Sequence, residues 1–273
     1  MPNYLSFSSY WRRTGFKGYR SLEWEGLDHI GTSSVRKLRL SYCGAHEAAL
    51  KDLLSWPSAL EELWYEADQG EWAPGFEEEG EEVPDYTTSA IERCLASQVG
   101  SLRKLVFSRP VQDHEGLGYS EGINLRRYEK LQSLSINHVF LIGFEDANTN
   151  VWERLPKSLV ELDVFYDDSG YINFMENAER PGWLFDLLEK KQQFFPALEK
   201  VRILSCEGAG HDEDEAVGVQ AEWSPGGDLV QAFVRADVSF TLYLNEKHRY
   251  EYVANGEAWD DDWEVTEDKP SFP

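Results

Sequence analysis

The sequence predicts an α/β fold made of repeated strand–helix units, and two observations lead to this prediction. The first is a nine-residue pattern that occurs twice in similar form, as VRKLRLSYC (residues 35–43) and LEKVRILSC (198–206). Both copies have apolar residues at positions one, four and six, and cysteine at position nine. The second is that segments with the apolar spacing of a helix separate the copies. Alternation of strand and helix is typical of a parallel sheet, because parallel strands need crossover connections.

Apolar residues recur with this spacing in five further segments, so the pattern occurs seven times. The copies begin at Tyr19, Val35, Leu60, Leu102, Leu131, Leu159 and Leu198. From Val35 onward the intervals are 25, 42, 29, 28 and 39 residues, so the repeat has no strict period. Each copy is expected to form one strand whose fourth and sixth residues point into the core.

Helices are predicted for residues 45–56, 87–99, 150–155, 180–195 and 227–237. Two of them have the spacing of a capping box, Ser89 with Glu92 and Asn150 with Glu153. Pro181 suits a first helical turn, and Asp228 suits an N-cap.

A strand followed by a helix, repeated in this way, is typical of a leucine-rich-repeat solenoid. We therefore expect an irregular right-handed horseshoe with a parallel concave sheet and helices on the convex side. In such repeats Asn or Cys at position nine turns inward and bonds the backbone, which assigns a structural role to Cys43 and Cys206. Cys94 is expected to face the core from its helix. We predict no catalytic thiol.

We predict a single domain over residues 1–273, with atypical ends because a solenoid leaves its core open at both ends. Residues 1–18 are expected to fold over the first repeat as an N-terminal cap, and residues 19–237 to form the repeats. Alternating apolar residues in 238–255, around the sequence NEK, predict an antiparallel hairpin that closes the sheet edge. Residues 256–273 form an acidic tail.

The charge and the cysteine content limit the classes of partner and the compartment. The chain has 26 Lys and Arg against 50 Asp and Glu, a formal net charge of −24. Such a chain repels phosphate backbones, so we expect no nucleic-acid partner. No apolar run approaches the roughly 20 residues that cross a bilayer, so we expect no membrane partner. Three dispersed cysteines predict a reducing location, cytoplasmic or nuclear.

The chain resembles the fungal leucine-rich-repeat proteins of the F-box type over roughly residues 20–245. The segments with the resemblance are VRKLRLSYCGAHEAALKDLLSWPSALEELWYE, SLRKLVF, LRRYEKLQSLSINHVFLIG, LPKSLVELDVF and LLEKKQQFFPALEKVRI. The resemblance implies a protein that recruits substrates, in members with an F-box to a ubiquitin ligase. No helical F-box segment precedes these repeats, so we do not expect the ubiquitin-ligase adaptor role.

A protein partner is expected to bind the outward-facing strand residues, which form parallel columns with one residue per repeat. The predicted partner-binding residues are Arg39, Trp64, Glu66, Ser135, Asn137, Asp163, Phe165 and Arg202. Trp64 and Phe165 would be the anchors, because aromatic residues often dominate binding energy. Alternatively, Arg39 stacks on Trp64 as a cation–π pair. A separate alternative is that the columns are only solvated residues of the sheet.

Acidic insertions at 66–85, 206–218 and 256–268 offer a second surface, with tryptophans among the carboxylates. They would suit a basic partner, or they are solvated segments without a partner.

The motifs for chemistry are weak, and we predict no catalytic residue, no metal and no cofactor. GYSEG (118–122) matches a nucleophile pattern around Ser120, but a loop precedes it instead of a buried strand. HDEDE (211–215) and DDDWE (260–264) lack the spacing of a calcium loop. The expected function is therefore a non-catalytic protein-binding module, in a substrate-recognition or scaffold role. The alternative is an enzyme or small-molecule-binding protein with a pocket between the sheet and the long loops, where Glu66 and His138 would act.

Overall fold

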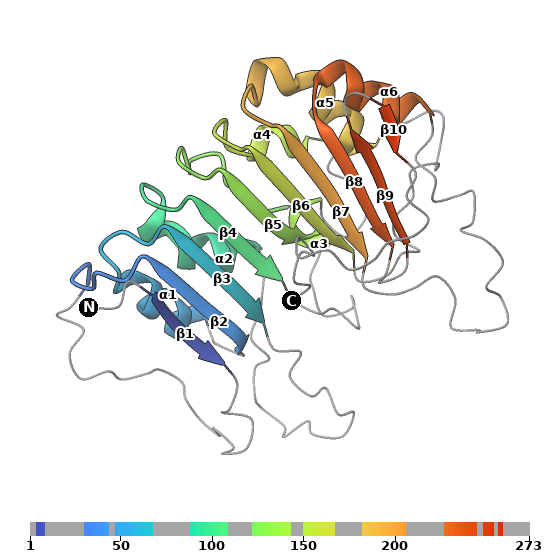
Figure 1. The fold of residues 1–273 in the computed structure, drawn as a ribbon. Helices are drawn as coiled ribbons and strands as arrows, with labels where there is room; N and C mark the ends of the chain where they lie inside the picture. Colours follow the sequence, from blue (N-terminus) through green and yellow to red (C-terminus); the bar gives the residue numbers. More distant parts are fainter. Residues whose placement is uncertain are drawn as a thin grey trace, which may run out of the picture.

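The computed structural model describes residues 4–8, 30–43, 47–67, 88–108, 122–142, 150–166, 182–205, 227–244, 248–253 and 256–258. In these residues ten strands form one sheet, and their order in the sheet is their order in the chain (Figure 1). Neighbouring strands are parallel from the first to the eighth. These are β1 Tyr4–Ser8, β2 Lys37–Cys43, β3 Glu62–Ala67, β4 Lys104–Ser108, β5 Ser133–Asn137, β6 Glu161–Tyr166, β7 Lys200–Ser205 and β8 Ser239–Leu244. The predicted α/β class with a parallel sheet is confirmed.

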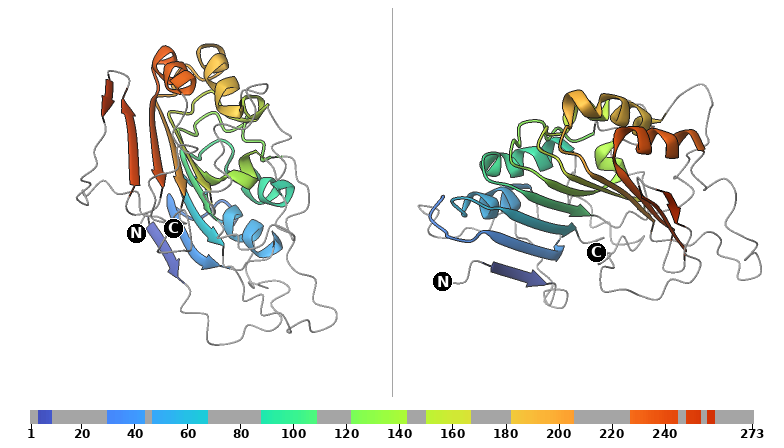
Figure 2. Two further views of the ribbon diagram at one scale, coloured as in Figure 1. Left: turned by 90° about the vertical axis from the view of Figure 1, so that its right-hand side faces the viewer. Right: turned by 45° about the horizontal axis from the view of Figure 1, so that its top comes forward.

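The described helices lie on one side of the sheet (Figure 2). They are α1 Glu47–Ser55, α2 Thr88–Leu95 with the 3-10 turn η3 Ala96–Gln98, α3 His138–Leu141, α4 Val151–Arg154, α5 Trp183–Phe194 and α6 Gly227–Ala236. None of the helices in the described ranges has the length and apolar content needed to cross a bilayer.

The core lies between the sheet and the helices and consists of the repeated apolar positions. The fourth position contributes Leu38, Leu63, Leu105, Leu134, Leu162 and Val201, and the sixth Leu40, Tyr65, Phe107, Ile136, Val164 and Ile203, all buried. Strand pairing joins each residue to its counterpart in the next copy, for example Leu38 to Leu63 and Leu63 to Leu105. Burial of a side chain of this size stabilises the fold by about 1.5–3 kcal/mol. The repeated apolar side chains therefore contribute substantially to the stability of the fold.

The junctions before the strands also repeat. The carbonyl of Arg36 accepts the N–H groups of Glu61 and Glu62. In the same way, the carbonyls of Glu61, Arg103, Gln132 and Val160 each accept two consecutive N–H groups at the start of the next strand. The N–O distances are 2.7–3.2 Å. Five junctions thus have the same backbone geometry although the intervals between the copies differ.

Gln98 ties the end of α1 to the entry of β3. Its buried side chain accepts a hydrogen bond from the N–H of Leu60 at 2.8 Å. Its amide nitrogen donates to the carbonyls of Leu54 and Pro57 at 2.7 and 3.0 Å. One side chain therefore satisfies three backbone groups, as buried polar groups require.

Two predicted capping boxes are wrong. The helix around Ser89 begins one residue earlier, at Thr88. The Glu92 carboxylate instead accepts the N–H of Asn124, 2.7 Å away. Asn150 does occupy the N-cap of α4, but its side chain makes no capping hydrogen bond. At Glu92 a long-range contact thus replaces the local one that the spacing suggested.

Two other helix starts differ slightly from the predictions. α5 begins at Trp183 with Gly182 as its N-cap, so Pro181, which lies outside the described residues, precedes the first turn. α6 already begins at Gly227 and includes Asp228 in its first turn. Both helices begin within two residues of the position that Pro181 or Asp228 predicted.

The two edges of the sheet follow the predictions in part. β8 and β9 (His248–Val253) pair antiparallel, which confirms the hairpin, and β10 (Gly256–Ala258) continues it within the predicted tail. At the other edge β1 pairs with β2 and holds the place expected for the copy at Tyr19. That copy lies outside the described residues, as do Cys206 and the Cys43 side chain.

Candidate functional site

The strand side chains that point away from the helices form the outer face of the sheet, and they align as predicted. The pairing places Arg39, Trp64, Val106, Ser135, Asp163 and Arg202 in one column across β2 to β7. The column nearer the strand starts contains Lys37, Glu62, Lys104, Ser133, Glu161 and Lys200. Toward the strand ends, Glu66 pairs with Ser108, and Phe165 lies between Asn137 and Leu204.

Burial on the outer face rises from the strand starts to the strand ends. Lys37 and Lys104 are exposed, and Arg39 and Trp64 are half-buried. Glu66, Ser135, Asn137, Asp163 and Phe165 are buried, so five of the eight predicted contact residues are not accessible. Val106, Phe165 and Leu204 of these columns are buried too, and with their core-facing neighbours they make apolar runs within the strands. Such runs are typical of strands covered on both faces.

Arg39 and Trp64 make direct contact on the outer face, next to the exposed column at the strand starts. We call this part of the sheet the accessible end of the outer face. The guanidinium carbon of Arg39 lies 4.2 Å from the centroid of the Trp64 ring. This geometry confirms the alternative that the two stack as a cation–π pair, worth about 1 kcal/mol at a partly exposed site. Beside them Lys37 Nζ lies 2.6 Å from Glu62 Oε1, and this hydrogen bond raises the pKa of Lys37.

Ser135, Asp163 and Arg202 form a network across three strands. Arg202 Nε lies 2.5 Å from Asp163 Oδ1, and Nη2 lies 2.6 Å from Oδ2. The Ser135 hydroxyl donates to the same Oδ2 at 2.8 Å. Glu161 adds a longer contact of 3.9 Å to Arg202. These residues satisfy one another, so the network supports the sheet and does not present free groups to a partner.

The structure separates the two residues named for catalysis. Glu66 belongs to the outer face. The His138 ring stacks on Tyr166 with centroids 4.4 Å apart, and Tyr166 is part of the core on the helix side. The pair therefore lies on opposite faces of the sheet and does not form an acid–base pair around one ligand.

The other weak motifs give no site in the described residues. Ser120, HDEDE and DDDWE lie outside them, as do most residues of the acidic insertions. Gly122, the last glycine of GYSEG, has a packing role, because a Cβ there would lie 2.1 Å from the carbonyl oxygen of Leu141. Within the described part of the chain, no group of three metal-ligating side chains is present.

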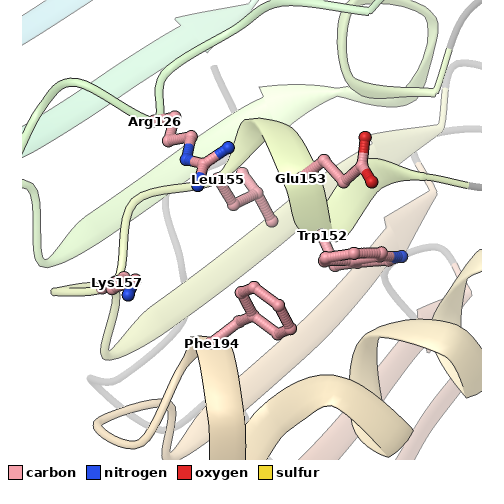
Figure 3. Close-up of a pocket in the computed structure, with 6 residues that line it drawn as sticks. All are labelled: Arg126, Trp152, Glu153, Leu155, Lys157 and Phe194. Atoms are coloured by element: carbon pink, nitrogen blue, oxygen red, sulfur yellow. The ribbon is translucent and has the colours of Figure 1, made fainter.

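A pocket of about 220 Å³ lies at the turns before β5 and β6 and was missed by sequence reasoning (Figure 3). It is lined by Arg126, Trp152, Glu153, Leu155, Lys157 and Phe194. The rings of Trp152 and Phe194 are 4.6 Å apart between centroids. In Figure 3 the two cations flank one side, the two rings lie on the other, and the Glu153 carboxylate points away. In the sequence, this surface is indicated only by the charge-rich segment LRRYEK (residues 125–130).

Comparison of the chain with protein-family models, curated proteins and solved structures finds no match in any of the three. The function is therefore inferred from the side chains that the fold brings together.

Proposed function

We propose that this protein is a non-catalytic protein-binding module on a leucine-rich-repeat solenoid, in a substrate-recognition or scaffold role. The solenoid assignment is supported by the seven copies of one pattern, the strand order along the sheet and the repeated junction geometry. The resemblance to fungal F-box-type repeat proteins agrees with such a role. The low cysteine content supports a cytoplasmic or nuclear location.

The binding surface is the accessible end of the outer face, centred on Arg39 and Trp64. The observation that supports it best is the half-buried cation–π pair beside the charged column at the strand starts. Arg and Trp are the residue types that most often dominate binding energy, and a ring of polar groups around them excludes water. Lys37, Glu62 and Lys104 provide such polar groups along one side of the pair, across three strands. Phe165 is removed from the proposed anchors because it is buried.

Affinity capture with paired variants tests this proposal. The immobilised protein is incubated with native cell extract, and bound proteins are compared by mass spectrometry between wild type and Arg39→Ala with Trp64→Ala. We expect at least one partner to be lost by about 10-fold or more, because truncation of a central anchor typically costs about 2 kcal/mol or more. Lys51→Ala, an exposed residue of α1, is the control that retains capture. If the anchor variant captures every protein that the wild type captures, the proposed surface is wrong.

A small-molecule site on the outer face is the second candidate. The Ser108 hydroxyl and the Trp64 Nε1 group are buried, and in the described part of the chain neither has a hydrogen-bond partner. Buried groups of this kind need a partner, which a ligand would supply. A thermal-shift screen with metabolites should then give a stabilisation that Ser108→Ala abolishes. If no compound stabilises the protein and Ser108→Ala raises Tm, Ser108 has no ligand role.

A further inference from the structure

Exposed cations gather on the turns before β4, β5 and β6. We call them the basic rim: Arg103, Arg126, Arg127, Lys130 and Lys157. Two exposed carboxylates, Glu129 and Glu153, lie among them, and the half-buried Glu92 carboxylate accepts the N–H of Asn124 beside them, so the cations outnumber the carboxylates by five to three. The whole chain has a charge of −24. The rim is thus opposite in sign to the protein as a whole.

The cations of the basic rim differ from other cations of the described residues in their ion pairing. Among the described residues none of the five forms an ion pair, whereas Arg36, Lys37 and Arg202 each pair with a carboxylate. Exposed charges without a partner remain available to a ligand. At physiological salt only charges within about 8 Å of one another interact strongly, so a bound ligand responds mainly to the cations that it touches.

The turns that hold the rim are fixed to one another. The N–H of Tyr128 donates to the Leu125 carbonyl at 3.0 Å, and the N–H of Leu131 donates to the Tyr128 carbonyl at 2.9 Å. The Ser158 hydroxyl, next to Lys157, donates to the Leu131 carbonyl at 2.8 Å. A preorganised surface loses less entropy when it binds.

The pocket that Trp152 and Phe194 line together opens beside two of these cations, Arg126 and Lys157 (Figure 3). Its volume of about 220 Å³ is below the roughly 300–1,000 Å³ of pockets that enclose a whole small molecule. It suits one apolar side chain of a larger ligand. An aromatic ring would pack against Trp152 and Phe194, which themselves pack at 4.6 Å.

We infer that the basic rim binds an acidic protein segment that inserts one aromatic side chain into this pocket. Carboxylates on both sides of the aromatic residue would pair with Arg126 and Lys157, while the ring occupies the apolar part. This surface is separate from the Arg39–Trp64 surface, so each proposal can be tested without the other. A short peptide fits the local charge, whereas an extended nucleic acid would also meet the surplus acid elsewhere in the chain.

Fluorescence anisotropy with defined peptides tests this inference on the full chain. The probe is a fluorescein-labelled peptide with three Glu-Glu-Phe-Glu units, compared with Gln-Gln-Phe-Gln and Glu-Glu-Ala-Glu peptides of equal length. We expect Kd to rise by about 10-fold or more for each altered peptide and with increasing salt. Arg126→Gln with Lys157→Gln should weaken the first peptide by about 10-fold or more, because both charges are then absent.

Two controls separate this surface from the others. Lys51→Gln changes an exposed cation of α1, outside the basic rim, and should leave Kd within about two-fold of the wild-type value. Arg39→Ala with Trp64→Ala should likewise leave Kd within about two-fold. The inference is wrong if the glutamine peptide binds as tightly as the acidic peptide, or if the rim variant retains full affinity. A 12-nucleotide single strand that binds more tightly than the acidic peptide would also overturn it, since the rim would then be a nucleic-acid site.

Discussion

Arg39 and Trp64 are register partners on adjacent parallel strands, and the Arg39 guanidinium carbon lies 4.2 Å from the centroid of the Trp64 ring. The contact follows from the repeat itself, because the fifth residue of each copy is paired with the fifth residue of the next. The pair is half-buried on a face of the sheet that is otherwise closed toward the strand ends. The two side chains therefore contact each other and also expose part of their surface to solvent.

A double-mutant cycle should measure this contact. We expect Arg39→Ala and Trp64→Ala to show a coupling energy of about 0.5–1 kcal/mol in the free energy of urea unfolding. Arg39→Lys should retain part of it, because an ammonium also binds the ring face. A coupling energy of zero would mean that the two side chains contribute independently.

The buried Asp163–Arg202 pair should matter far more for stability than the exposed Lys37–Glu62 pair. Asp163→Asn leaves the mostly buried Arg202 with only the longer contact to Glu161 as counter-charge, so we expect the free energy of unfolding to fall by about 3 kcal/mol. Glu62→Gln should cost less than about 1 kcal/mol, because that pair is exposed. Asp163→Leu with Arg202→Leu should regain most of the loss. Equal effects of Asp163→Asn and Glu62→Gln would contradict the difference in burial.

Gln98 should be among the most sensitive polar positions. Gln98→Met removes the partners of the Leu60 N–H and the Pro57 carbonyl, and buried groups left unsatisfied cost about 1–3 kcal/mol each. We expect a loss of about 2–4 kcal/mol in chemical unfolding. Ser97→Ala is the matched control, because Gln98 still donates to the Leu54 carbonyl that Ser97 shares. A change of less than about 0.5 kcal/mol in the Gln98 variant would disprove the bridging role.

Cys94 should react slowly with thiol reagents. Burial raises the pKa of its thiol from 9.0 to about 11, so at pH 8 the thiolate fraction is about 100-fold lower than in the unfolded chain. Alkylation of the Cys94 peptide, followed by mass spectrometry, should be at least about 100-fold slower in the native protein than in urea. Equal rates would show that the helix α2 does not bury the thiol.

The register of the sheet could be predicted because the same spacing recurs in every copy. Once Leu38, Leu63 and Leu105 point into the core, the residues between them must align on the other face. The burial of that face was missed, although VFY in β6 and LVF in β4 are continuous apolar runs that indicate cover on both sides.

Contacts between distant segments could not be predicted from one sequence. The spacing of Ser89 and Glu92 suggests a local cap, yet Glu92 accepts the N–H of Asn124, 32 residues away. The aromatic pocket likewise needs Trp152 and Phe194 from different helices beside Arg126 from a turn. Local spacing specifies the strands and the core, but such side-chain groups depend on how the irregular intervals place each turn.

Site-specific photo-crosslinking tests the central proposal, that a protein partner binds the accessible end of the outer face. A photoreactive phenylalanine replaces Lys104, next to Glu62 on that face, or Lys51 on the exposed side of α1. The proposal predicts a distinct crosslinked protein from native extract at position 104 that is missing at position 51 and is lost when Trp64→Ala is added. Identical crosslinks at both positions, or none at position 104, would contradict it.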